Sequence, residues 1–149
     1  MSMHREDAVP SGLELLRAAR GHETSAGIGL LLGMRFEDIE DGRLTLRCRT
    51  RSQFANPLGT LHGGILATLL DSAMGCAVHT TLPGGIGYTS VDLAVKFLRP
   101  GSIDDVELLA EGRVVHRGRR TSTAEGTVHD AAGRLLATGT TTCLILRDD

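Results

Sequence analysis

One segment, residues 56–80, constrains this 149-residue chain more than any other stretch. It reads NPLGTLHGGILATLLDSAMGCAVHT, a turn-rich entry followed by the longest uninterrupted apolar helical pattern in the sequence. From Ile65 onward the residues are apolar or small at nearly every position, at spacings typical of one long helix. Because this pattern leaves hardly any polar face, it predicts a helix that begins at or near Gly63 and is covered on most sides.

The start of this helix is a predicted site for a developing negative charge. The first N–H groups of a helix have no partner inside it, and the helix dipole adds positive potential at the same end. At Gly63 and Gly64 no side chain shields these amides, so a carbonyl oxygen can approach closely and be stabilised as an oxyanion. The alternative is structural, since a glycine pair also lets a helix pack closely on a sheet.

Asp71 interrupts the apolar run and is the second candidate for chemistry. An ionised carboxylate there is costly unless it is paired, hydrogen bonded or facing a wet cleft, so Asp71 is either functional or a satisfied buried acid. Eight residues at about 1.5 Å each place it roughly 12 Å along the axis from Gly63, too far for one small reacting group to touch both. Two antiparallel helices across a two-fold axis would bring Gly63 of one chain near Asp71 of the other, so the spacing predicts at least a dimer.

Further motif residues extend the pattern on both sides. They are Asn56-x-x-Gly59-x-x-His62-Gly63-Gly64, then Asp71, then Ser90-Val91-Asp92 opening a strand that ends at Phe97-Leu98-Arg99-Pro100. Over roughly residues 30–146 the chain resembles the hotdog-fold acyl-CoA thioesterases, in particular the phenylacetate-pathway and 4-hydroxybenzoyl-CoA thioesterase-like branch. The resemblance implies an α+β hotdog fold, in which a curved antiparallel sheet wraps a long central helix. It also implies paired subunits with active sites at their interface and, by analogy, a homotetramer.

The same resemblance assigns a role to each motif residue in the hydrolysis of an acyl-CoA thioester to free acid and CoA. The Gly63 amide polarises the thioester carbonyl, assisted by Asn56 and His62. Asp71 of the partner subunit acts as general base or nucleophile, and Ser90 helps to hold the water. From the residues alone, His62 is equally a helix cap and Ser90 a small strand residue, so the assignment rests on their joint spacing.

Four arginines are candidates for binding the CoA part of the substrate, together with Gly64. Arg99, Arg117, Arg119 and Arg120 fall at strand ends and in a hairpin, where guanidinium groups can bind phosphates through paired hydrogen bonds. A solvated hairpin is the alternative. The chain has no motif for nucleotide hydrolysis or dinucleotide binding, and its cysteines and histidines show no metal-ligand spacing. We therefore expect no metal and no separate cofactor.

Length and composition indicate one globular domain, which we divide into an N-terminal helix and linker over 1–29 and a thioesterase domain over 30–149. A net charge of -2 with mixed signs argues against a nucleic-acid partner. The N-terminus has no apolar signal region, and the helix is too short and interrupted to span a bilayer. We therefore expect a cytoplasmic protein.

Periodicity and turn signals predict the remaining elements. Ser11 is a natural cap for the first helix, and Asp41-Gly42 is a strong hairpin signal. The expected elements are a helix over 11–20, a linker over 21–29 and strands over 31–37, 43–49, 88–98, 103–116, 121–129 and 135–146. We interpret 88–98 as the central strand of a four-strand meander. Its alternation predicts one face with Val91, Leu93, Val95 and Phe97 and an opposite face with Ser90, Asp92, Ala94 and Lys96.

Three functions remain open at this stage. A thioester hydrolase requires the Gly63 amide and the Asp71 carboxylate to converge across a dimer. A hotdog-fold hydratase or dehydratase normally uses a catalytic His with an acid in other motifs, which we do not find. A non-catalytic acyl-CoA binding protein would keep the cleft and need no Asp71. With three Phe, one Tyr and no Trp, the composition does not identify the acyl group.

Overall fold

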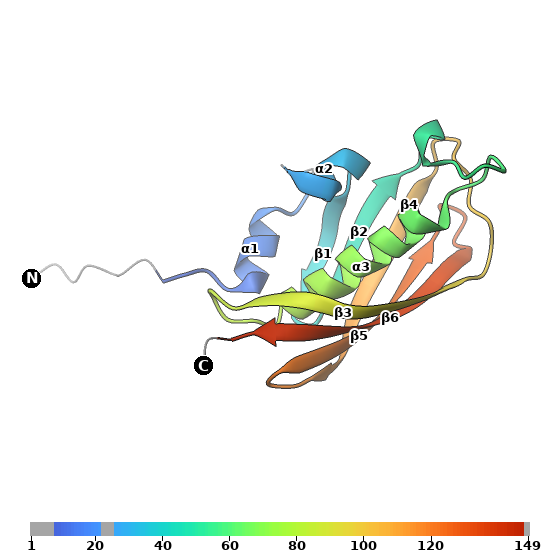
Figure 1. Cartoon of the computed structure of the whole chain (residues 1–149). Helices are drawn as coiled ribbons and strands as arrows, with labels where there is room; N and C mark the ends of the chain where they lie inside the picture. Colours follow the sequence, from blue (N-terminus) through green and yellow to red (C-terminus); the bar gives the residue numbers. More distant parts are fainter. Residues whose placement is uncertain (1–7, 22–25, 148–149) are drawn as a thin grey trace, which may run out of the picture.

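The computed structural model describes residues 8–21 and 26–147. Its helical elements are α1 (Gly12–Ala18), α2 (Gly27–Leu32), the 3₁₀ turn η1 (Ser52–Phe54) and α3 (Gly63–His79). Its strands are β1 (Arg35–Glu40), β2 (Arg43–Arg49), β3 (Gly87–Phe97), β4 (Glu107–Arg117), β5 (Thr121–His129) and β6 (Leu135–Leu146). The strands form one antiparallel sheet in the order β1-β2-β4-β5-β6-β3, which curves around α3 (Figure 1). The predicted α+β fold, with a long helix wrapped by a curved sheet, is confirmed.

The core lies between α3 and the inner face of the sheet. Eight residues of α3 are buried, namely Leu66, Leu69, Leu70, Ala73, Met74, Gly75, Ala77 and Val78. On β2, Leu44, Leu46 and Cys48 are fully buried, so the face predicted for this strand is confirmed. Burial of one Leu-sized side chain contributes about 1.5–3 kcal/mol, so the packing of α3 on the sheet dominates the stability of the fold.

Three glycines in a row across the sheet allow α3 to pack closely against it. Gly112, Gly126 and Gly139 are paired in register across β4, β5 and β6. A Cβ atom on Gly112 would overlap the Ala73 carbonyl and lie 2.6 Å from Met74 N. The backbone of the helix therefore approaches the backbone of β4 so closely that no side chain fits between them.

The position of β3 differs from the prediction. β3 is an edge strand, and within the described sheet it pairs only with β6. Residues 98–106 carry the chain from β3 to β4, which pairs with β2 and β5, so the meander contains only β4, β5 and β6. The alternation of 88–98 was read correctly as a strand. Its place in the sheet was wrong because periodicity reports which faces are covered and not which strands are neighbours.

Several element boundaries also differ from the prediction. Leu31 was assigned to a strand, but it belongs to α2, which ends at Gly33 with φ of 70°. Short apolar runs such as Leu30 to Leu32 do not distinguish a helix from a strand. Residues 103–106 precede β4, whose strand begins at Glu107. β1 ends at Glu40 instead of residue 37, and α2 begins at Gly27 within the predicted 21–29 linker. The bounds of β2, β5 and β6 match the prediction.

The N-terminal helix is confirmed where the structure describes it. Ser11 caps α1, with its hydroxyl accepting a hydrogen bond from Glu14 N at 3.2 Å and the Glu14 carboxylate accepting one from Ser11 N at 3.2 Å. Residues 1–7 and 22–25, which belong to the predicted helix-and-linker region, lie outside the described residues. The division of the chain at residue 29 stays a prediction.

Membrane spans and metal clusters were also sought among residues 8–21 and 26–147. No helix there is long and apolar enough to cross a bilayer. No three His, Cys, Asp or Glu side chains in these ranges are placed to hold a metal ion.

Replacement of Gly112 by Ala is expected to lower the free energy of unfolding by about 2 kcal/mol or more, because the added Cβ must push α3 away from β4. Gly87→Ala is the matched control, since its Cβ would meet only Leu146 Cδ1 at 3.6 Å. Urea denaturation followed by circular dichroism, at equal protein concentrations, measures both variants. Equal stabilities for the two variants would contradict the close approach of α3 to the sheet.

Candidate active site

Asp71 and Ser90 form the contact around which the candidate site is built. Asp71 lies near the middle of α3, and Ser90 Oγ on β3 donates a hydrogen bond to Asp71 Oδ1 at 2.8 Å. Both residues are half-buried. In the described part of the chain, no Lys, Arg or His forms an ion pair with Asp71, and its Oδ2 accepts no hydrogen bond from protein. The carboxylate is therefore oriented by one neutral donor and keeps an oxygen available for water or substrate.

A β-bulge in β3 turns Ser90 toward α3. Ser90 pairs with Cys143 on β6, and the next pair is Asp92 with Thr142, so Val91 is the extra residue. Cys143 is buried whereas Thr142 is not, which places Ser90 and Asp92 on opposite faces of the sheet although they are two residues apart. Bulges commonly re-aim a side chain next to an active site.

The bulge overturns part of the predicted alternation of this strand. The sequence pattern placed Ser90 and Leu93 on different faces of the sheet. The register shift puts both on the inner face, because Ser90 pairs with the buried Cys143 and Leu93 pairs with the buried Thr141. A bulge inserts one residue without requiring a particular residue type, so the period-two pattern cannot reveal it. The resemblance implied that Ser90 helps to hold the water, and that role stays a prediction; the contact of its hydroxyl with Asp71 is a finding of the structure.

Sequence reasoning missed three uncharged side chains near Asp71, which are Cys76, Tyr88 and Cys143, and a histidine that packs on Tyr88. Burial raises the pKa of the Cys76 thiol to about 11 and also raises the pKa of the Tyr88 hydroxyl and of the Cys143 thiol. Burial lowers the pKa of His79, whose ring centroid lies 5.4 Å from that of Tyr88. These four groups are therefore neutral near pH 7, and they come from α3, β3 and β6. Asp71 is the acidic side chain next to these neutral groups.

In the N-terminal turn of α3, the Gly64 N–H donates a hydrogen bond to a side chain, whereas the Gly63 N–H is available to a ligand. His62 is the N-cap, because its Nδ1 accepts a hydrogen bond from Gly64 N at 2.8 Å. Among the described residues, the Gly63 N–H has no hydrogen-bond partner, so it is the donor available to an oxyanion. A Cβ on Gly63 would lie 3.0 Å from the exposed Phe97 ring, so a larger residue at position 63 requires only a small movement of that ring. The assignment of Gly64 to CoA stays a prediction.

Asn56 organises the loop that leads into α3. Its Oδ1 accepts hydrogen bonds from Leu58 N at 3.0 Å and Thr60 N at 3.1 Å, and its Nδ2 donates to Thr60 Oγ1 at 2.8 Å. Gly59 completes the turn with φ of 82°, a conformation that favours glycine. An amide carries two N–H donors, so Asn56 retains one for a substrate carbonyl. That role stays a prediction.

The candidate CoA-binding arginines do not converge within one chain. The hairpin residues are Arg117, Arg119 and Arg120. Arg117 pairs with Asp41 at 3.1 Å, and the adjacent turn is tied to the C-terminal end of α3 because Gly42 N donates to Thr80 Oγ1. Arg99 instead follows β3 shortly after Phe97, whose ring lies against Gly63 at the other end of α3. Their CoA contacts stay predictions.

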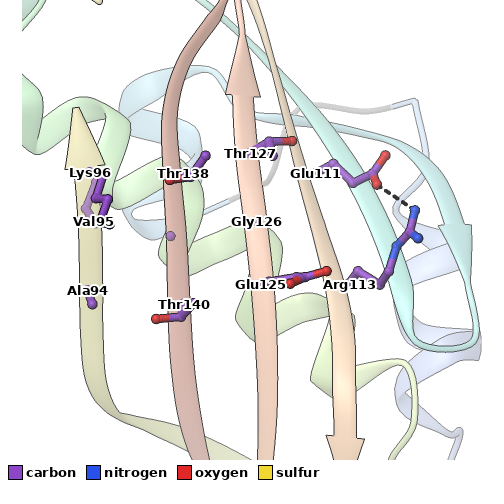
Figure 2. A pocket seen from close by; sticks show the side chains of 11 residues that line it. Ala94, Val95, Lys96, Glu111, Arg113, Glu125, Gly126, Thr127, Thr138 and Thr140 are labelled. Carbon is purple, nitrogen blue, oxygen red and sulfur yellow. Dashed lines mark hydrogen bonds and ion pairs between the residues drawn. The ribbon is translucent and has the colours of Figure 1, made fainter. Parts of the chain in front are cut away.

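A hollow lies on the outer face of the sheet, away from Asp71. It has a volume of about 670 Å³, and Figure 2 shows side chains from four neighbouring strands around it. These include Lys96, Glu111, Arg113, Glu125, Thr127 and Thr140. Among the described residues, no predicted site residue lines this hollow. This hollow is therefore separate from the candidate site around Asp71 and Gly63.

Comparisons of sequence converge on one family. The family model described as Thioesterase superfamily matches residues 58–137, a range that contains Gly63, Asp71 and Ser90. A Halobacterium salinarum protein that carries the provisional name of an esterase is 35% identical over 134 residues, which cover 83% of this chain and 87% of that protein. Acyl-coenzyme A thioesterase 13 of Mus musculus is 32% identical over 98 residues, which cover 65% of this chain and 69% of the mouse protein.

A solved structure agrees with the sequence relatives. A phenylacetic acid degradation-related protein from Ralstonia eutropha, provisionally named a thioesterase, superposes with a TM-score of 0.77 at 28% identity. The match covers 89% of this chain and 98% of that protein. The resemblance drawn from the motifs around residues 56–100 is therefore confirmed.

Replacement of His62 by Ala is expected to lower the free energy of unfolding by about 1 kcal/mol, because the Gly64 N–H loses its cap. His62→Asn retains an acceptor at the cap position and is expected to stay within about 0.5 kcal/mol of the parent. Urea titrations of the three proteins at one concentration provide the comparison. An unchanged stability for His62→Ala would exclude the capping role.

Proposed function

The chain belongs to the thioesterase superfamily, and we propose that it hydrolyses acyl-CoA thioesters to a free acid and CoA. Hydrolysis of a thioester follows from the family. The acyl-CoA substrate is supported by the mouse relative, which is named an acyl-coenzyme A thioesterase. The observation that carries the mechanism is the Ser90–Asp71 hydrogen bond, because it orients a carboxylate whose second oxygen is free to accept a proton.

In the proposed reaction, the thioester carbonyl oxygen lies against the Gly63 N–H of one subunit. One such donor is worth about 10²- to 10³-fold in turnover, since it strengthens as the oxygen becomes an oxyanion. Asp71 of the partner subunit takes a proton from water, which adds to the carbonyl carbon, and the intermediate collapses with loss of CoA thiolate. In the alternative route, Asp71 attacks the carbonyl itself and water then hydrolyses the mixed anhydride.

A dimer formed along β3 is the assembly that we propose. β3 is an 11-residue edge strand whose exposed apolar residues include Val91 and Phe97, at 58% and 56% exposure. A long apolar edge of this kind is a template for pairing with another chain. Antiparallel pairing across a two-fold axis would also set the two α3 helices antiparallel and bring each Gly63 toward the other chain's Asp71. A homotetramer built from such dimers rests on the family resemblance.

The two other functions have less support from the geometry. A binding protein needs no carboxylate held by a hydroxyl beside neutral groups, which is the arrangement around Asp71. A hydratase requires a catalytic His, whereas His62 is engaged as a helix cap and His79 packs on Tyr88. The cytoplasmic location and the absence of a nucleic-acid partner stay predictions.

The first test replaces Asp71 by Asn, which keeps shape and hydrogen bonding but removes the base. We expect kcat to fall by at least about 10²-fold while CoA binding changes little, because general-base catalysis is worth about 10²- to 10⁴-fold. Thiol trapping with aryl, short-chain and long-chain acyl-CoA measures turnover and also defines the acyl preference. Glu125→Gln, an exposed carboxylate on the outer face, is the control. A stable Asp71→Asn protein with near-parent kcat would favour the binding-protein function.

The second test asks whether each site is shared between subunits. Gly63→Pro removes the N–H donor at a helix position where Pro is tolerated, and the φ of -64° and ψ of 131° at His62 suit a following Pro. Gly63→Pro and Asp71→Asn are each expected to be inactive. When the two are co-refolded in equal amounts, about half of the dimers are mixed and carry one intact site, so activity should recover to about a quarter of the parent. No recovery in mixed dimers verified by mass, or a fully active monomer by light scattering, would contradict the shared site.

A further inference from the structure

Asp92 holds the bulge of β3 through two hydrogen bonds from consecutive residues of β6. Thr142 N donates to the Asp92 carboxylate Oδ1 at 2.7 Å. Thr141 Oγ1 donates to the Asp92 carbonyl oxygen at 2.8 Å. A bulge disrupts the regular ladder, and backbone N–H groups then need other acceptors. The Asp92 side chain supplies such an acceptor immediately after the extra residue.

This attachment matters because β3 has β6 as its only neighbour in the described sheet. A change of register by one residue moves a side chain to the other face of a sheet. Ser90 faces Asp71 only because the register shifts between Ser90 and Asp92. If the bulge relaxed to regular pairing, the Ser90 hydroxyl would leave its 2.8 Å hydrogen bond with Asp71.

We propose that Asp92 is a positioning residue for the thioesterase reaction, fixing the β3 bulge in the register that aims the Ser90 hydroxyl at Asp71. This inference rests on the proposed function. Asp92 is exposed and pairs with Thr142 on the outer face, so it is on the opposite side of the sheet from Asp71 and does not touch the reacting atoms. Its effect on turnover passes through Ser90.

Two variants of Asp92 differ in whether they keep a hydrogen-bond acceptor for Thr142 N. Asp92→Ala removes the acceptor for Thr142 N, whereas Asp92→Asn keeps a carbonyl oxygen there and loses only the charge assistance. We expect Asp92→Ala to lower kcat by about tenfold with KM within about twofold, since misplacing a catalytic group costs turnover more than binding. Asp92→Asn is expected to stay within about threefold of the parent. Glu125→Ala, which removes an exposed carboxylate from the same face, is the matched control.

A double-mutant cycle with Ser90→Ala distinguishes positioning from a general loss of structure. If Asp92 acts through Ser90, then Asp92→Ala causes no further loss of kcat once the Ser90 hydroxyl is gone. Equal fold losses in the parent and Ser90→Ala backgrounds would overturn the proposal, as would parent kcat in a folded Asp92→Ala protein. If Asp92→Ala does not fold, Thr141→Val replaces it, because this variant removes the hydroxyl donor to the Asp92 carbonyl and keeps a side chain of similar size.

A readout that is independent of turnover separates this inference from the proposed function. We would measure amide hydrogen exchange at Thr142 in both Asp92 variants alongside the kinetics. Their crystal structures would be determined as well. We expect Asp92→Ala to lose protection at Thr142 and the Ser90–Asp71 hydrogen bond, and Asp92→Asn to keep both. A parent protein without thioesterase activity would refute the proposed function. An unchanged Thr142 amide with an intact Ser90–Asp71 bond in Asp92→Ala would refute the positioning role, whatever the turnover.

Discussion

The close contact between α3 and the glycine row of the sheet is the constraint on which the rest of the structure depends. Gly112 lets the helix backbone rest almost directly on β4, and Gly126 and Gly139 make room on β5 and β6 for the Leu70 and Met74 side chains of α3. This contact sets the depth of the helix within the curved sheet and therefore the position of Asp71 relative to β3. Because β3 is an edge strand that pairs only with β6 in the described sheet, the hydrogen bond between Ser90 and Asp71 joins the central helix to a strand with a single neighbour.

The same helix that forms the core also carries both halves of the proposed chemistry, at positions that cannot meet within one chain. The Gly63 N–H, which has no partner among the described residues, lies at the positive end of the helix dipole. The positive potential of the dipole falls off within the first turn. Asp71 lies about two turns further on, where that effect has faded. In the proposed dimer, a second copy of the chain would resolve this conflict and would also cover the apolar edge of β3. Stability and activity are therefore expected to depend on the same interface.

The sequence predicted the parts of the fold that depend on local patterns. The start of α3 at Gly63, the turn at Asp41-Gly42 and the buried face of β2 all follow from glycines and periodicity close together in the chain. The edge position of β3 did not follow, because strand order is decided by contacts between distant segments. The bulge at Val91 was equally hidden, since it changes the register without a distinctive residue.

Asp71 has a neutral hydroxyl, and not a cation, as its hydrogen-bond partner, and this suits a residue that has to accept a proton. A cationic partner favours the charged form of a carboxylate and so opposes uptake of a proton. Ser90 orients Asp71 without adding a charge, and the Cys76 and Tyr88 side chains beside it are protonated near pH 7. Orientation then depends on how firmly β3 is held, because a neutral hydrogen bond contributes only about 0.5–1.5 kcal/mol and cannot by itself fix a strand. The backbone of an edge strand thus has to be secured by other contacts, and those that secure it at this point come from β6 to Asp92.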